Sequence, residues 1–196
     1  MAAVIKENGY PVTIVDSFAE GLNLRDLKAR ILNLIPDIIG ISTLTYNGAI
    51  SYELGQWLKR TLPDTLVVLG NIHAQVYAKQ YLENGCCDIV VHGEGEYAFL
   101  EIIKSYEKKL KPTGIPATSF LDANGKYCRT AGSEIVAELE KLPFPARDLV
   151  NPNLYNLTEI SNQLYIGGKN TVAKTMSTSR GCPFRCPYCQ NYEILT

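Results

Sequence analysis

Short apolar segments alternate with longer amphipathic segments along the first half of the chain. The apolar segments are residues 12–16, 37–42, 66–70 and 88–91. They are almost continuously apolar, as are parallel strands that helices cover on both faces. The amphipathic segments are residues 24–34, 49–62, 74–83 and 97–109. This alternation predicts an α/β fold with a doubly wound parallel sheet of the Rossmann or flavodoxin type.

The start of the chain has the pattern of a helix end. Residues 1–8 read as the last turns of a helix, and Gly9 is a typical C-cap residue. A strand would ordinarily precede such a helix in an alternating fold. We therefore expect the first strand of the sheet to lie upstream of Met1.

The alternation of apolar and amphipathic segments ends near Pro112. Residues 117–121 and 126–130 flank Asp122-Ala123-Asn124-Gly125, which predicts a β-hairpin. A short helix over 134–142 and an extended segment over 171–179 are expected farther on. These patterns divide the chain into an α/β domain over 1–131, a linker over 132–170, and the start of a further domain over 171–196.

Composition narrows the classes of function. The formal net charge is −1, and 46% of residues are hydrophobic. This charge balance gives no indication of a nucleic-acid-binding protein. No apolar run is long enough to span a membrane, and we expect no signal peptide at the start of the sequence. Cys86, Cys87 and Cys128 read as small buried hydrophobes in a reducing compartment, so we expect a cytoplasmic protein.

A doubly wound sheet binds its ligand beyond the carboxyl ends of its strands. Gly70 and Gly93 would let backbone approach a ligand there, and Ser42, Thr43 and Thr45 offer hydroxyl groups. No phosphate-binding G-x-x-x-x-G-K-[ST] segment is present, which disfavours a nucleotide site of that kind. His73 and His92 stand at strand ends, where each could contact a ligand or equally cap a helix or satisfy a carbonyl.

Near the end of the chain, Cys182, Cys186 and Cys189 form a C-x-x-x-C-x-x-C pattern. Thiolates are soft ligands that suit iron–sulfur clusters or zinc. Without a fourth cysteine or histidine nearby, the loop leaves one metal position open, whereas a structural zinc site uses four protein ligands. A zinc knuckle and a chance grouping of cysteines are the alternatives.

The stretch S-R-G-C-P-F-x-C-x-Y-C resembles the cluster-binding motif of radical S-adenosylmethionine enzymes, with Tyr188 at the aromatic position. The resemblance implies a 4Fe–4S cluster held by Cys182, Cys186 and Cys189, with S-adenosylmethionine on the fourth iron. It also implies an external electron donor of the flavodoxin or ferredoxin type and a small-molecule substrate. A full (β/α) barrel needs about 250 residues, so 171–196 would supply only its first strand and cluster loop.

The first domain resembles the cobalamin-binding domain found ahead of such catalytic domains. The matching segments are V-x-I-V-D, P-D-I-I-G-I-S, V-V-L-G-x-x-H, D-I-V-V-x-G-E-G-E and L-P-F-P-A-R-D. The cobalamin contacts that this implies are Ser42, Thr45, Gly70, Asn71, His73, Gly93 and Glu94. The family commonly has Gly-Gly at Gly70-Asn71, and the D-x-H-x-x-G motif that supplies a histidine to cobalt is absent.

Together the two resemblances imply a cobalamin-dependent radical S-adenosylmethionine enzyme that transfers a methyl group to, or rearranges, an unactivated carbon. The alternative is a cobalamin or small-molecule binding module whose metal loop holds structural zinc and has no catalytic role.

Overall fold

The computed structural model describes residues 1–132, 136, 138–155, 177, 179–182, 184 and 186–189. Its helices are α1 (Ala2–Glu7), α2 (Leu24–Leu34), α3 (Gly48–Thr61), α4 (Ile72–Val76), α5 (Ala78–Glu83) and α6 (Gly95–Glu107). Its strands are β1 (Ile38–Ser42), β2 (Leu66–Gly70), β3 (Ile89–Val91), β4 (Thr118–Leu121) and β5 (Tyr127–Arg129). Single 3₁₀ turns lie at η1 (Thr45–Asn47), η2 (Leu139–Lys141), η3 (Arg147–Leu149) and η4 (Pro152–Tyr155).

The strands form one mixed sheet in the order β1-β2-β3-β4-β5. β1, β2 and β3 are parallel, and Ile38 is opposite Leu66 in the register of the first pair. The predicted hairpin exists, but β4 and β5 extend the same sheet in antiparallel fashion. The prediction of a purely parallel sheet was therefore wrong at this edge, because a hairpin can add to an exposed strand without any crossover helix.

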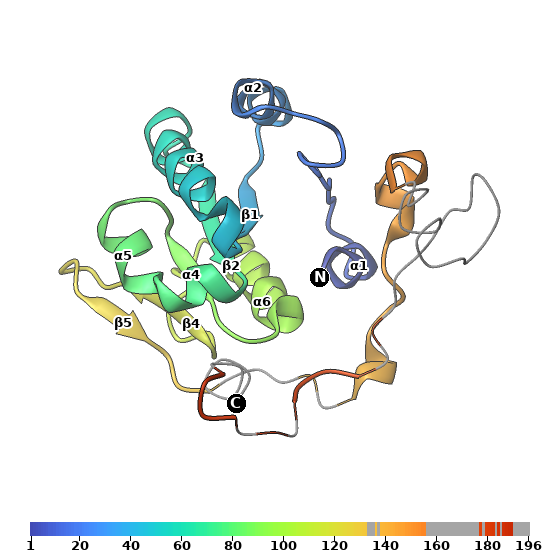
Figure 1. Ribbon diagram of the computed structural model, residues 1–196. Helices are drawn as coiled ribbons and strands as arrows, with labels where there is room; N and C mark the ends of the chain where they lie inside the picture. The colour runs from blue at the N-terminus through green and yellow to red at the C-terminus, as the bar shows by residue number, and fades with distance from the viewer. Residues whose placement is uncertain are drawn as a thin grey trace.

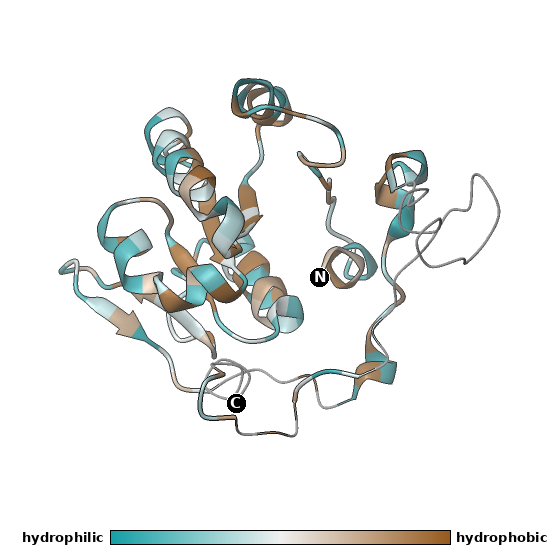
Figure 2. Cartoon of the chain, in the orientation of Figure 1, coloured by the Kyte–Doolittle hydropathy of each residue, from teal (hydrophilic) through white to brown (hydrophobic). Residues whose placement is uncertain are grey.

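Helices cover both faces of the sheet, as predicted (Figure 1). On one face, Val67 and Leu69 pack with Leu54 and Leu58 of α3 and with residues of α5. On the other face, Val68 packs with Ile5 of α1 and with Phe99 and Ile102 of α6. Successive side chains of a strand point to opposite faces, so the apolar run of β2 supplies both cores. Figure 2 shows the same arrangement as brown strands between helices whose outer surfaces are teal.

Residues 12–16 do not form the predicted strand. β1 pairs only with β2 among the described strands, so no backbone ladder includes 12–16. The apolar residues of the segment are partly buried without it, since Val12 packs against the core under α6. Apolar patterning indicates burial, whereas a strand also requires a paired neighbour.

Most predicted helices lie within two residues of their expected bounds. Asn23 caps α2, where its side chain accepts a 3.0 Å hydrogen bond from the backbone N–H of Asp26. The single helix expected over 74–83 is instead the pair α4 and α5, which meet at Tyr77. No helix in the described part of the chain has the length and apolarity needed to cross a membrane.

The segment after β5 returns to the start of the chain (Figure 1). Lys6 of α1 forms an ion pair with Asp148, and the Tyr155 hydroxyl donates a 2.7 Å hydrogen bond to Asp16. The helix expected over 134–142 is described only in part, and its described end is the turn η2. The strand expected over 171–179 lies almost wholly outside the described residues, as does any further part of a barrel.

Candidate cofactor site

Two of the predicted strand-end loops are joined by backbone hydrogen bonds. The N–H of Thr43, just past β1, donates to the carbonyl of Gly70 at the end of β2 over 2.9 Å. The N–H of His73 returns a 3.2 Å hydrogen bond to the carbonyl of Thr43. The structure thus brings Ser42, Thr45, Gly70, Asn71 and His73 to one edge of the sheet, where the sequence predicted them.

The space beside Gly70 is open. A Cβ built on Gly70 would meet no protein atom within 4 Å. Packing within the protein therefore does not require a glycine at this position. The position instead suits the close approach of a ligand to the backbone, which is a common role of glycine.

Asn71 follows Gly70 with an unusual backbone. Its φ of 75° and ψ of 170° lie in a region that is almost restricted to glycine. The side chain compensates locally: its oxygen accepts a 2.7 Å hydrogen bond from the N–H of Ile72, and its amide donates over 3.1 Å to the Ser42 hydroxyl. A strained residue is therefore held at the loop where the sequence predicts cofactor contact.

Thr43 lies in the same loop, although the cobalamin contacts predicted from the sequence did not include it. Its side chain is fully buried, and its hydroxyl has no hydrogen-bond partner among the described residues. Buried hydroxyls are usually satisfied, so an orphan at a ligand-binding edge indicates where a polar group could be accommodated. Its place beside Ser42 and Thr45 was the only signal in the sequence.

His73 packs inward against protein. Its ring lies 4.6 Å from the ring of Tyr77 and 6.1 Å from that of Tyr81, centroid to centroid. A Cβ on Gly48 would lie 2.5 Å from its Nε2 atom, so the imidazole occupies the space beside the start of α3. This supports the helix-packing interpretation of His73 over direct ligand contact.

His92 is a structural residue. It is buried, and its Nε2 atom lies 2.7 Å from the Ser119 hydroxyl, which itself lies 2.9 Å from the hydroxyl of Tyr127. Burial, assisted by the charge of Arg129, lowers the pKa of His92 to about 4. The neutral imidazole therefore joins β3 to the hairpin, which favours a structural role for His92 over ligand contact.

Other parts of the protein already contact the turn after β3. Gly93 has a φ of 65°, which lets the chain turn into α6. Glu94 accepts a 2.6 Å hydrogen bond from the N–H of Val136 and pairs with Arg180 at 3.3 Å. Its carboxylate is thus already bound by two cationic or polar donors, so its expected contact with cobalamin has a direct competitor.

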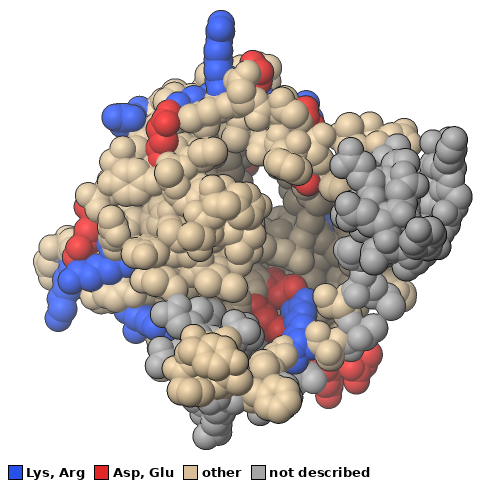
Figure 3. All heavy atoms as spheres, in the orientation of Figure 1, with Lys and Arg blue, Asp and Glu red and all other residues tan. Residues whose placement is uncertain are grey.

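The surface around the joined loops carries few charges. Several large apolar side chains are exposed on η1, α3, α4 and the residue after α4: Tyr46, Ile50, Ile72, Val76 and Tyr77. Figure 3 shows this side of the molecule as a broad uncharged area with Lys, Arg, Asp and Glu at its margins. Such a surface suits a large, flat, mostly apolar ligand.

The structure describes all three cysteines that the sequence predicts as metal ligands, Cys182, Cys186 and Cys189. The N–H of Cys189 donates a 3.0 Å hydrogen bond to the carbonyl of Cys186, so these two residues are joined by a tight turn. Tyr188, within that turn, is 89% exposed. No three metal-binding side chains lie close enough to hold an ion among the described residues. Thiolate spacing and the turn suit a metal centre, but the convergence of the three sulfur atoms is not seen.

Of the other cysteines, Cys86 and Cys87 are buried as predicted, whereas Cys128 on β5 is only partly buried, so the prediction of a buried residue was wrong there. Burial raises the pKa of the Cys86 thiol to about 11 and that of Cys87 well above its ordinary value. Thiols of this kind are poor ligands and nucleophiles, because the thiolate is the reactive form.

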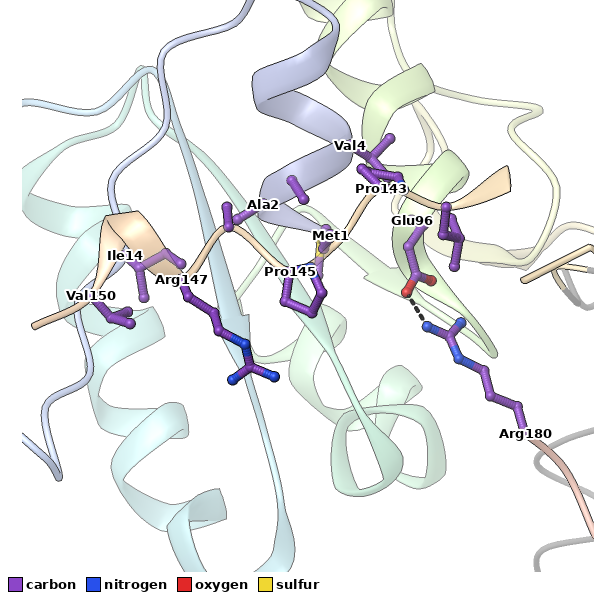
Figure 4. Close-up of a pocket in the computed structure, with 13 residues that line it drawn as sticks. Met1, Ala2, Val4, Ile14, Glu96, Pro143, Pro145, Arg147, Val150 and Arg180 are labelled. Atoms are coloured by element: carbon purple, nitrogen blue, oxygen red, sulfur yellow. Dashed lines mark hydrogen bonds and ion pairs between the residues drawn. The ribbon is translucent and has the colours of Figure 1, made fainter. Parts of the chain in front are cut away.

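A cavity of about 290 Å³ lies apart from the strand-end loops, between α1, the segment 142–150 and Arg180 (Figure 4). Its walls are mainly Ala, Val, Ile and Pro side chains, with Glu96 and Arg180 at one side. It shares none of the residues that the sequence predicted to bind cobalamin. The predicted site is thus an open surface, and the cavity is a separate feature between the linker and the first helix.

Comparison with known proteins identifies the family of the α/β domain. The B12 binding domain family matches residues 1–103. An uncharacterized methyltransferase of Pyrococcus horikoshii is 28% identical over 97% of this chain and 39% of its own length. An anaerobic magnesium-protoporphyrin IX monomethyl ester cyclase of Rubrivivax gelatinosus is 27% identical over 99% of this chain and 34% of its own length.

The fold is also shared with a solved structure, the cobalamin-dependent S-adenosylmethionine radical enzyme OxsB with aqua-cobalamin and S-adenosylmethionine bound. The TM-score is 0.66 at 24% identity, over 81% of this chain and 21% of that one. The chain spans less than half the length of each of these relatives. The curated relatives also include the cobalamin-dependent radical SAM methyltransferase TokK of Streptomyces tokunonensis, which is 25% identical over 79% of this chain and 22% of its own length. The family match covers more than half of this chain, and the chain therefore belongs to the B12-binding domain family.

Proposed function

We propose that the joined loops after β1 and β2 bind cobalamin as part of a cobalamin-dependent radical S-adenosylmethionine enzyme. The observation that carries the cobalamin site is the open space beside Gly70, next to the strained Asn71 and the unpartnered hydroxyl of Thr43. Gly70 lets the ring approach the backbone, and the uncharged surface excludes water from its face. No D-x-H-x-x-G motif supplies a histidine to cobalt, and His73 packs against Tyr77 and Tyr81.

The cysteine loop holds a 4Fe–4S cluster in this proposal, through Cys182, Cys186 and Cys189. Three thiolates leave one iron without a protein ligand, which suits binding of S-adenosylmethionine there. When bound, this cofactor pair supplies one-electron cleavage of S-adenosylmethionine and hence a radical that can abstract hydrogen from an unactivated carbon. Tyr188 is exposed beside the ligands and can line the cofactor pocket.

The reaction class follows from these cofactors. Methyl transfer to, or rearrangement of, an unactivated carbon in a small molecule fits a cobalamin carrier beside a radical source, with an external electron donor of the flavodoxin or ferredoxin type. A second function has one observation in its favour: the family match ends at residue 103, well before the cysteine loop. A cobalamin-binding module with a structural zinc loop would therefore contain zinc and no acid-labile sulfide.

The test of the cobalamin site is the substitution Gly70→Val. A Cβ at this position meets no protein atom within 4 Å, so the free energy of unfolding should stay within about 0.5 kcal/mol of the parent value, as for a typical surface change. Cobalamin affinity should fall at least tenfold, because the branched side chain fills the space for the ring. Binding is measured by titration followed by the cobalamin absorbance spectrum.

Ala29→Val on the exposed side of α2 is the matched control and should leave affinity unchanged. His73→Ala should weaken binding less than Gly70→Val. Lack of saturable binding at micromolar cobalamin in the parent protein, or a spectrum that shows cobalt ligated by a protein histidine, would overturn the proposal.

A further inference from the structure

In the described part of the cysteine loop, the side chain of Arg180 forms ion pairs with the α/β domain. Its guanidinium lies 2.7 Å from a carboxylate oxygen of Glu96 and 3.3 Å from one of Glu94 (Figure 4 shows the Glu96 contact). Arg180 stands two residues before Cys182, and the two glutamates flank Gly95 at the start of α6. Residues 84 positions apart in the sequence are thereby joined beside the first metal ligand.

Both carboxylates are well shielded from water. Their side chains are only 15% and 14% exposed, and that of Arg180 is 35% exposed. Burial is the largest single influence and raises the pKa of Glu96. The hydrogen bond and charge of Arg180, a backbone hydrogen bond and the charge of the N-terminal amino group together outweigh burial, so the pKa lies below its ordinary value. A shielded pair of this kind contributes more than a surface ion pair, because loss of one partner leaves a poorly hydrated charge.

The position of the glutamates connects this contact to the cofactor edge. They follow β3, and Gly93 with its positive φ leads directly into them. Glu94 also accepts the N–H of Val136, so the segment between the hairpin and the linker meets the same turn. Arg180 therefore fastens the cysteine loop to the strand-end side of the sheet, the side on which the loops of β1 and β2 lie.

We infer that Arg180 is a positioning residue that holds the cysteine loop at a fixed place against Glu94 and Glu96, so that the metal centre and the cobalamin face lie on one side of the molecule. The inference rests on the proposed function for its purpose, while the contact itself can be tested in metal-free protein. A guanidinium suits this task because its planar fork can bind two carboxylates at once.

The test is a double-mutant cycle with Arg180→Gln, Glu96→Gln and both together in the metal-free protein. Backbone hydrogen exchange is measured by mass spectrometry on peptides that cover residues 179–189. Arg180→Gln should exchange about three to ten times faster than the parent in this loop, and Glu96→Gln by no more than this factor, since Glu94 still pairs with Arg180. The double variant should exchange no faster than Arg180→Gln alone, because Glu96 acts on the loop through Arg180. Arg180→Lys should restore part of the protection.

Glu101→Gln is the matched control, since Glu101 is on the same helix and pairs locally with Lys104 at 2.8 Å. It should leave the loop unchanged. Exchange in β2 and β3 should be the same in all variants, which separates a local contact from general loss of stability. Unaltered exchange in the loop, or effects of Arg180→Gln and Glu96→Gln that simply multiply, would show the inference to be wrong.

A second measurement is made on protein reconstituted with iron and sulfide. The rate of iron transfer to a chelator should rise in Arg180→Gln, rise by no larger a factor in Glu96→Gln, and remain unchanged in Glu101→Gln. If no iron binds while the exchange cycle shows coupling, the proposed metal centre fails but the positioning contact stands. Coupling absent in both measurements rejects the contact whatever the metal content.

Discussion

At the scale of single residues, the site combines an open glycine, a strained asparagine and an unpartnered threonine within two adjoining loops. Each has a different energetic consequence. Gly70 leaves space, Asn71 stores backbone strain, and Thr43 buries a hydroxyl that has no hydrogen-bond partner in the described part of the chain. Strain and unsatisfied polar groups persist where the surrounding structure enforces them, and they concentrate at functional sites.

Asn71→Gly and Asn71→Ala should separate strain from hydrogen bonding. Both remove the contacts of the side chain with Ile72 and Ser42, but only glycine relieves the conformation at φ 75°. We expect the alanine variant to be less stable than the glycine variant by about 1–2 kcal/mol, given the usual size of such strain. At ordinary positions alanine is the more stable residue, so urea unfolding in which alanine equals or exceeds glycine would contradict this account.

His92 should make stability depend on pH. Its pKa is lowered in the folded protein to about 4, whereas an unfolded histidine has a pKa of about 6.5. The full stability is therefore present above pH 6.5 and is lost progressively as pH falls toward 4, because only the unfolded chain takes up the proton readily. Between pH 7.5 and pH 5 this one group should lower the free energy of unfolding by at most about 2 kcal/mol.

Urea unfolding of the parent and of His92→Gln at both pH values isolates that contribution, since other groups titrate alike in the two proteins. The difference in unfolding free energy between pH 7.5 and pH 5 should be smaller in the variant. Equal pH dependence in the two proteins would count against a buried neutral His92.

At the scale of elements, close packing of α3 against the turn before β3 depends on Gly55. A Cβ at this position would lie 2.2 Å from the carbonyl oxygen of Cys86. Alanine ordinarily stabilises a helix by about 1 kcal/mol relative to glycine. Because a backbone atom is the obstacle, we expect Gly55→Ala to lower the free energy of unfolding by about 1–3 kcal/mol instead.

Thermal or urea unfolding measures this effect, and Thr61→Ala at the exposed end of α3 is the control. The control should change stability little. A Gly55→Ala variant as stable as the parent would show that α3 can move away from the Cys86 turn without lowering the free energy of unfolding.

The elements that the sequence predicted well are those whose burial is decided locally. The apolar runs of β1, β2 and β3 and the amphipathic pattern of α2 predict both type and position. Residues 12–16 show the limit, because their apolar pattern is satisfied by packing while strand pairing depends on a neighbour elsewhere in the chain. The antiparallel attachment of β4 to β3 likewise depends on which edge is exposed.

The candidate site was predictable to a similar degree. Topology places the ends of parallel strands at one edge, so the gathering of Ser42, Gly70 and His73 followed from the sequence. The inward packing of His73 and the pairing of Glu94 with Arg180 did not, because both depend on contacts between segments far apart in the chain. Sequence spacing identifies ligand types, whereas tertiary contacts decide which side chains remain available.

At the scale of the whole molecule, the two proposed cofactor regions are arranged around one α/β domain. The proposed cobalamin edge is built from loops after β1 and β2, and the cysteine loop meets the turn after β3 through Arg180. Lys6 and Tyr155 fasten the intervening linker to the start of the chain. The connection between the two regions therefore consists largely of polar side-chain contacts, which makes their relative placement sensitive to single substitutions.

The cysteines should divide into two functional classes in the whole protein. Anaerobic reconstitution should give about four irons per chain with matching acid-labile sulfide, the content of one 4Fe–4S cluster. Cys186→Ala should abolish this, because two remaining thiolates cannot hold the cluster. Cys86→Ala and Cys128→Ala should retain the iron of the parent: Cys86 is buried with its pKa raised to about 11, and Cys128 lies on β5 away from the ligand spacing.

Iron and sulfide analysis with the absorbance near 400 nm measures the outcome. Full iron retention in Cys186→Ala, or zinc without sulfide in the parent, would reject the cluster in favour of a structural metal loop.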